Sequence, residues 1–150
     1  MKLLVSTPLT IIIGASDVVH VRAEDETGAF GILPGHADFL TALSISVATW
    51  KDQTGGEHHV AVRGGMLQVL SGDTITIATR EAIVSDDLAR LQTEVLTAFR
   101  REAEEEKSAR TDAQRLYLAA IRQINRFLNS ERTLAVPGER ITDLLKSSEP

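Results

Sequence analysis

The side chains best suited to chemistry in this sequence are its histidines and its clustered carboxylates. The histidines are His20, His36, His58 and His59, and the chain contains no cysteine. Adjacent side chains on a strand point to opposite faces, so His58 and His59 cannot bind one metal ion together, and no thiolate accompanies them. We therefore expect no metal site.

A catalytic centre is not indicated either. His36 and Asp38 could form a general base and its partner, as in a histidine-dependent hydrolase, but no nucleophile stands with them. The acidic runs Glu24–Glu26 and Glu104–Glu106 have the pattern of solvated surface charge. The motifs Gly-x-Ser-x-Gly and His-Glu-x-x-His are absent. We expect no catalytic residue, and hence a small binding or structural module.

Two glycine pairs could suggest a phosphate-binding loop. Neither Gly55–Gly56 nor Gly64–Gly65 fits the pattern Gly-x-x-x-x-Gly-Lys-Ser/Thr, and neither opens an expected helix. Hairpin turns and β-bulges explain such pairs better.

The composition excludes several further classes of protein. With 43% hydrophobic and 25% charged residues in 150, the chain is globular rather than disordered. A net charge of −5 argues against sequence-independent binding to nucleic acid. No stretch reaches the roughly 18 to 20 apolar residues that cross a bilayer, so we expect no direct membrane insertion. The absence of cysteine fits a reducing compartment.

The segment 28–43 (GAFGILPGHADFLTAL) is the centre of the expected fold. Its glycines permit backbone angles that a side chain would obstruct, and Pro34 fixes its own φ, so we expect a tight corner with His36 and Asp38 at a polar tip. Apolar residues on both sides should anchor this corner to the core, namely Phe30, Ile32, Leu33, Phe39, Leu40 and Leu43.

Short apolar stretches separated by turn residues predict a β-sandwich over residues 1–84. The expected strands are 3–6, 9–13, 18–23, 29–32, 39–50, 59–62, 66–70 and 74–78. Alternation within the third should place Val19, Val21 and Ala23 on one face and Val18, His20 and Arg22 on the other.

The apolar period changes near Ser85, a good helix N-cap that is followed by two aspartates. A second helix is indicated by Thr111 and Gln114, which have the spacing of a capping box. With a short link at Ser108–Arg110, we expect an antiparallel two-helix hairpin over 85–130, and a poorly ordered tail over 131–150. The predicted class is α+β, an antiparallel sandwich followed by a helical hairpin.

Three segments in order resemble the epsilon subunit of the rotary, F-type ATP synthases. They are 28–37 (GAFGILPGHA), 62–69 (VRGGMLQV) and 75–78 (ITIA). The resemblance covers about Leu3 to Leu91, and the helical remainder more loosely. The weak helical match and the extended tail indicate a divergent or alternative form of the subunit.

The resemblance implies a non-catalytic subunit of the central rotor stalk, seated on the gamma subunit and on the polar loops of the membrane c-ring. Such a subunit couples proton or sodium transport to ATP synthesis or hydrolysis, peripherally, at the cytoplasmic face of the bacterial inner membrane. Its helical hairpin would meet the catalytic alpha/beta head transiently and regulate hydrolysis.

The resemblance also assigns candidate residues. Gly31, Pro34, Gly35 and His36 match the loop that faces the c-ring, with His36 as polar contact. The alternative for His36 is a hydrogen bond within its own turn. Ala29 stands where the family often has an acidic residue, for which the run Glu24–Glu26 could compensate.

Some bacterial epsilon subunits bind ATP as a regulatory ligand through [Ile/Leu]-Asp-x-x-Arg-Ala on the first helix and arginines on the second. Asp87, Arg90, Arg122 and Arg126 match that pattern, although Asp86 and Leu91 replace its aliphatic residue and its alanine. Intrahelical ion pairing is the simpler explanation of these residues. No other cofactor is expected.

One alternative function from another class remains open at this point. The chain could be a free-standing β-sandwich that binds a small ligand beneath a helical lid. Such a protein would be a stable monomer with a ligand pocket, whereas a rotor subunit would copurify with gamma.

Overall fold

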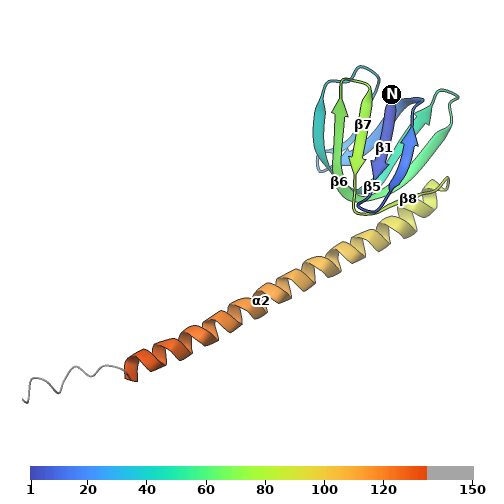
Figure 1. Ribbon diagram of the computed structural model, residues 1–150. Coiled ribbons are helices and arrows are strands. Elements are labelled where there is room, and N and C mark those ends of the chain that lie inside the picture. The colour runs from blue at the N-terminus through green and yellow to red at the C-terminus, as the bar shows by residue number, and fades with distance from the viewer. Residues whose placement is uncertain (135–150) are drawn as a thin grey trace, which may run out of the picture. The chain divides into compact units, whose positions relative to one another are not determined.

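The computed structural model describes the backbone of residues 1–134 and the side chains of residues 1–130. Eight strands come first, followed by helical segments (Figure 1). The strands are β1 (Lys2–Ser6), β2 (Ile11–Ala15), β3 (Val18–Asp25), β4 (Gly28–Ile32), β5 (Phe39–Asp52), β6 (Glu57–Leu70), β7 (Thr74–Ala78) and β8 (Ala82–Val84). They confirm the predicted sandwich.

The two layers of the sandwich share the long strands β5 and β6. The strand order is β2-β1-β7-β6-β5-β3-β4, and β8 pairs with β6 apart from this path. The latter half of β6 pairs with β7, whereas its first half pairs with β8. All neighbouring strands are antiparallel except β1 and β7, which run parallel and depart from the wholly antiparallel expectation.

At Gly64 and Gly65, strand β6 passes from pairing with β8 to pairing with β7. This bend accounts for the two glycines, so a phosphate-binding role is not needed to explain them. Both have positive φ, 66° and 117°. A β-carbon on Gly65 would clash with the carbonyl oxygen of Ala78, so only glycine fits there. The sequence suggested two strands on either side of this pair, but the structure has one continuous strand that bends. The other pair, Gly55–Gly56, lies in the β5–β6 hairpin turn, as expected.

The hydrophobic core lies between the layers and is built mainly from aliphatic side chains. Fully buried members include Val5, Val21, Ile32, Leu67 and Ile75. In β3 the predicted alternation holds from His20 to Ala23, but Val18 is buried and Val19 is exposed. A register irregularity between Val18 and His20 reverses the faces at that end of the strand.

Helical structure begins one turn after the strands end. The segments are α1 (Leu88–Arg90), a π-helical turn η1 (Leu91–Val95) and α2 (Leu96–Leu134). The N-cap is Asp87, whose carboxylate accepts a hydrogen bond from the Arg90 backbone N–H. Ser85, the expected cap, instead accepts one from the Asp87 backbone N–H.

The predicted break at Ser108–Arg110 is absent, so the expected hairpin is replaced by one helix through residue 134. No glycine or proline occurs between Leu96 and Leu134, and Ser, Ala and Arg are tolerated inside a helix. The Thr111 hydroxyl donates to the Lys107 carbonyl, four residues back, instead of capping a new helix. Of the predicted tail, 131–134 continue this helix and 135–150 lie outside the described residues.

The described chain forms two compact units, one from Met1 to Glu104 and one beginning at Glu105. Within the first unit, Leu91, Leu96 and Phe99 pack on Ala61 of β6 in a second, smaller core. No helix within residues 1–134 is long and apolar enough to span a bilayer.

Candidate functional site

The corner predicted from Pro34 and Gly35 is a β-turn. The backbone N–H of His36 donates to the Leu33 carbonyl at 3.2 Å, and Gly35 has a φ of 84°. Proline at the second position and a glycine with positive φ at the third are typical of a type II turn. The turn therefore has the local structure that the sequence predicted.

A second turn, at the end of the neighbouring strand β6, braces this corner. The Gly35 N–H donates to the Gly72 carbonyl at 2.8 Å, and the Ser71 N–H donates to an Asp38 carboxylate oxygen at 2.7 Å. A β-carbon on Gly72 would lie 2.8 Å from the Gly35 Cα. The segment 33–38 and the β6–β7 turn at 70–73, which we call the braced loops, thus form one surface.

His36 is satisfied in part within its own loop. Its Nδ1 donates to the Ala37 carbonyl at 2.7 Å, and its ring meets Phe39 edge to face, with centroids 5.8 Å apart. This is the local hydrogen bond that the sequence left as an alternative. No partner is present for Nε2 within residues 1–130, so that atom can still meet a partner.

Not all the apolar residues flanking the corner reach the core. Ile32 and Leu43 are buried, and Phe30 and Phe39 pack edge to face against each other at its margin. Leu33 and Leu40 were expected inside, but they are 59% and 61% exposed. Successive side chains alternate between faces of a strand, which places Leu40 outward when Phe39 points inward.

Gly31 lies in strand β4 rather than in the corner. It pairs with Arg22 of β3, and a β-carbon on it would lie 3.0 Å from Nε2 of His20. The missing side chain of Gly31 makes room for the imidazole of His20. Of the four residues assigned to the c-ring loop, only Pro34, Gly35 and His36 share the turn.

Ala29 has an acidic neighbour across the strand pair. The register of β3 and β4 places Glu24 directly opposite Ala29. Asp25 is occupied within the fold, because Thr27 and Thr41 donate hydrogen bonds that lower the pKa of its carboxyl. Of the acidic run 24–26, Glu24 is the residue that the strand register pairs with Ala29.

The four residues matched to an ATP-binding pattern are divided between the two units. Asp87 caps α1, and Arg90 lies 3.4 Å from the Glu94 carboxylate. Arg122 and Arg126 lie in the second unit, exposed and one turn apart on α2. Arg90 thus makes an ion pair of the kind that the simpler explanation predicts, whereas Asp87 accepts a backbone hydrogen bond as the N-cap. ATP binding stays a prediction.

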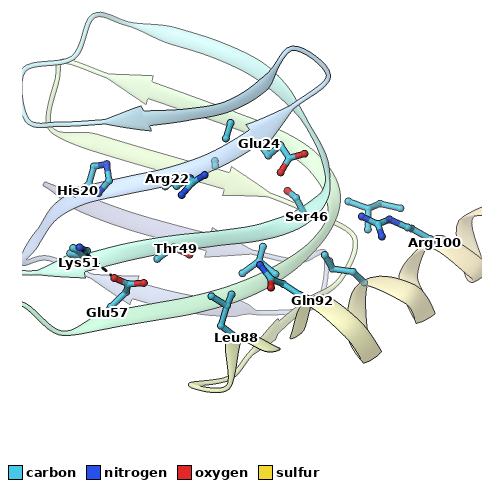
Figure 2. A pocket seen from close by; sticks show the side chains of 15 residues that line it. His20, Arg22, Glu24, Ser46, Thr49, Lys51, Glu57, Leu88, Gln92 and Arg100 are labelled. Carbon is cyan, nitrogen blue, oxygen red and sulfur yellow. Dashed lines mark ion pairs between the residues drawn. The ribbon is translucent and has the colours of Figure 1, made fainter. Parts of the chain in front are cut away.

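A groove of about 320 Å³ lies on the outer face of β3 and β5, beside the first helical turns (Figure 2). One wall is a helical stripe spaced every four residues, Leu88, Gln92, Leu96 and Arg100. The sheet contributes the polar and charged side chains of His20, Arg22, Glu24, Ser46, Thr49, Lys51 and Glu57. No periodicity in the sequence indicated this groove, because it depends on strand register.

The hairpin between β5 and β6 surrounds the carboxylate of Asp52 with hydrogen-bond donors. The Thr54 hydroxyl donates to Asp52 at 2.6 Å, the His58 ring lies 3.0 Å away, and the Gly56 N–H donates at 2.9 Å. These hydrogen bonds, that of Thr54 first, hold the pKa of Asp52 far below its ordinary value. His58 thus serves its own hairpin, stacked on Trp50.

Comparison with known proteins gives a consistent family. Residues 1–85 match the family model described as ATP synthase, Delta/Epsilon chain, beta-sandwich domain. An ATP synthase epsilon chain 2 of Paraburkholderia xenovorans is 40% identical over 132 residues, covering 88% of this chain and 95% of the relative. An ATP synthase epsilon chain 2 of Cereibacter sphaeroides is 34% identical, covering 99% of each chain.

Two solved structures share the fold. One is a chain of the Tetrahymena thermophila mitochondrial ATP synthase central stalk and c-ring, with a TM-score of 0.51 and 15% identity, covering 73% of this chain and 90% of that one. The other belongs to the Euglena gracilis mitochondrial ATP synthase, with a TM-score of 0.54 and 20% identity, covering 57% and 54%. At these identities the likeness concerns the fold alone.

Proposed function

This chain belongs to the epsilon chains of ATP synthase, and from that premise we propose that its sandwich is held between the gamma subunit and the c-ring. Epsilon chains are non-catalytic subunits of the central stalk, and this chain is one of them. It takes part in ATP synthesis as a component of the rotor. Family membership sets aside the free-standing ligand-binding sandwich as the chain's main role.

The main support for the proposed c-ring contact is the structure of the braced loops. Two turns that are distant in sequence are joined by the Gly35–Gly72 and Asp38–Ser71 hydrogen bonds. A contact that transmits torque needs a rigid surface. The hydrogen bonds between the two loops make this surface rigid. We infer that Pro34, Gly35 and the free Nε2 of His36 face the polar loops of the c-ring, with Gly31 shaping the adjoining strand.

Glu24 completes this proposed contact. The family often places an acid at the position of Ala29, and here Glu24 lies directly opposite Ala29 on the neighbouring strand. Side chains that are directly opposite have β-carbons about 5 Å apart, within the reach of a glutamate. Glu24 therefore offers its carboxylate to a c-ring loop from nearly the same place.

The contact with gamma is proposed for an apolar patch on the outer face of β5, β6 and β7. Leu40, Met66 and Leu70 are 61%, 45% and 43% exposed. Met66 pairs with Ala42 and with Ala78, and Gln68 lies on the same face between Met66 and Leu70. Exposed apolar patches of this kind mark protein interfaces.

The second unit supports a transient contact with the catalytic alpha/beta head. Its helix exposes a set of large apolar side chains, Leu116, Tyr117, Ile121, Ile124, Phe127 and Leu128. Arg115, Arg122 and Arg126 accompany them. This combination suits an acidic, partly apolar surface, and we propose that binding there regulates ATP hydrolysis.

The proposed location of the chain in the cell follows from these partners. We propose that the chain is a peripheral subunit at the cytoplasmic face of the bacterial inner membrane, where c-ring loops and gamma meet. Whether protons or sodium ions drive the rotor is decided by c-ring residues that this chain does not contain.

Regulatory ATP binding is retained as a second candidate because Arg122 and Arg126 share a helix face. Titration of the full chain with ATP tests it, with Arg126→Gln as variant and Arg110→Gln as control. Binding that weakens only in Arg126→Gln supports the candidate. Absence of binding at millimolar ATP removes it.

The c-ring contact is tested by assembly of the whole enzyme with Glu24→Gln. We expect this variant to weaken coupling of ATP hydrolysis to ion pumping, because it removes the proposed carboxylate while keeping its shape. Glu26→Gln, two residues away on the same run, is the control and should couple normally. Equal coupling in both variants would contradict the role of Glu24.

A further inference from the structure

Four polar side chains form a regular grid on the outer face of the sheet. The register of β3 and β5 pairs His20 with Lys51 and Arg22 with Thr49. Opposite β-carbons in such pairs lie about 5 Å apart, and successive pairs about 7 Å apart along the strands. The grid therefore brings imidazole, guanidinium, ammonium and hydroxyl groups together at one end of the groove.

Two acids, Glu24 and Glu57, line the same groove as the grid. Glu57, opposite Lys51, lies 3.4 Å from the Lys51 ammonium and 3.8 Å from the His59 ring. Glu24 lies two residues beyond Arg22 on the same face of β3, and Figure 2 shows it on the Ser46 side of the groove. Arg22, which is exposed, has no ion-pair or hydrogen-bond partner for its side chain within residues 1–130.

Neighbouring elements leave the grid accessible and give it a wall. On the edge of β3 that faces away from β5, Arg22 pairs with Gly31 of β4. Because glycine has no side chain, this position of β4 does not cover the guanidinium. On the helical side, Leu88 and Gln92 line the groove, with the Gln92 amide as a further donor. Gln92 lies in the π-helical turn η1, and such turns are frequent at functional sites.

We propose that this grid binds a small phosphate-bearing anion. Arg22 supplies the planar fork of N–H donors that matches phosphate oxygens, with His20, Lys51 and Gln92 beside it. The groove volume of about 320 Å³ is at the lower end of the range for small-molecule sites. The chain carries a net charge of −5, so its overall charge repels anions. Binding of an anion here would therefore depend on the local groups of the grid.

This site is independent of the rotor role and includes none of Asp87, Arg90, Arg122 or Arg126. The phosphate group could belong to free inorganic phosphate or to a nucleotide. The recognising chemistry is the same for both, and separate probes distinguish the two sources.

The test is titration of the full-length chain with sodium phosphate, sodium pyrophosphate and ATP at constant ionic strength, followed by calorimetry and amide chemical shifts. We expect saturable binding of at least one probe in the millimolar range or tighter, with shifts in residues 20–22 and 49–51. Binding of phosphate alone identifies the free anion, and binding of ATP alone identifies a nucleotide.

Variants separate this site from unspecific binding. Arg22→Gln should weaken binding about tenfold, as expected for loss of a charge-assisted hydrogen bond. Gly31→Ala, which changes no charge, should also weaken it because the added methyl group displaces the His20 ring. Arg110→Gln removes the same charge outside the groove and should bind as the parent chain does. Circular dichroism verifies that all three variants fold.

Three results would overturn the proposal. The first is the absence of saturable binding by any of the three probes. The second is unchanged affinity in a folded Arg22→Gln variant. The third is equal weakening in Arg22→Gln and Arg110→Gln, which would show that overall charge governs the interaction.

Discussion

The guanidinium of Arg63 lies 3.1 Å from the carboxylate of Glu102 and so joins strand β6 to helix α2. The Arg63 side chain is only 12% exposed and also lies 3.8 Å from Glu81. Beside this pair, Leu91, Leu96 and Phe99 cover Ala61. The start of the helical region is therefore held on the sandwich by an apolar cluster and an ion pair.

Removing the charge of Glu102 should loosen this attachment. Because the Glu102 carboxylate is partly exposed, we expect Glu102→Gln to lower the free energy of unfolding by roughly 1 kcal/mol or less. Amide hydrogen exchange should accelerate across Leu91–Phe99. Glu104→Gln, which alters a neighbouring carboxylate, should leave exchange there unchanged, and an equal acceleration in both variants would contradict the role of the ion pair.

Asp38 should matter to the braced loops more through its acceptor oxygen than through its charge. Asp38→Ala leaves the Ser71 N–H without its partner, and we expect a loss of about 1 kcal/mol in unfolding free energy with faster exchange at residues 70–73. Asp38→Asn keeps an acceptor and should behave nearly as the parent chain. A stable Asp38→Ala variant with protected 70–73 amides would show that the brace is not needed.

The second unit should be a continuous helix where the sequence suggested a turn. The chain has no cysteine, so Glu105→Cys and Gln123→Cys give two unique sites for spin labels. At 1.5 Å per residue, a helix separates their backbones by about 27 Å, whereas a turn at 108–110 would bring them within about 18 Å. The pair Asp112→Cys and Gln123→Cys, about 16 Å apart in either arrangement, calibrates the measurement.

Acid should weaken the β5–β6 hairpin through Asp52. Because hydrogen bonds hold the pKa of Asp52 below its ordinary 3.8, the ionised carboxylate stabilises the folded chain above that value. This contribution is lost as the pH falls from 3.8 towards the lower, folded-state pKa. The parent chain should therefore lose more stability in that window than Asp52→Asn, as measured by urea unfolding at each pH, and parallel curves would contradict this assignment.

The sequence predicted local features best. Pro34 and Gly35 specify a turn through their own backbone preferences, and the structure has that turn. The hydrogen bond from Ser71 to Asp38 spans 33 positions, and no local signal indicates it. Likewise, Glu24 meets Ala29 only because β3 and β4 pair in one particular register.

The misplaced features have identifiable causes. A single irregularity in β3 exchanged the faces of Val18 and Val19, and alternation cannot reveal such a bulge. The helix break was inferred from Thr111 and Gln114, but a threonine can also bond backwards inside a helix, as it does here. Strand β8 was not predicted, because its three residues are too few to show the alternation of apolar and polar side chains that marks a strand.

The most direct test of the rotor assignment is purification of a tagged full-length chain from cells that express the complete ATP synthase. We expect gamma to be recovered in a one-to-one ratio with the tagged chain. Substituting Met66→Glu on the apolar patch should reduce the recovered gamma while the chain stays folded. Recovery of the folded parent chain as a monomer without gamma would contradict the rotor assignment.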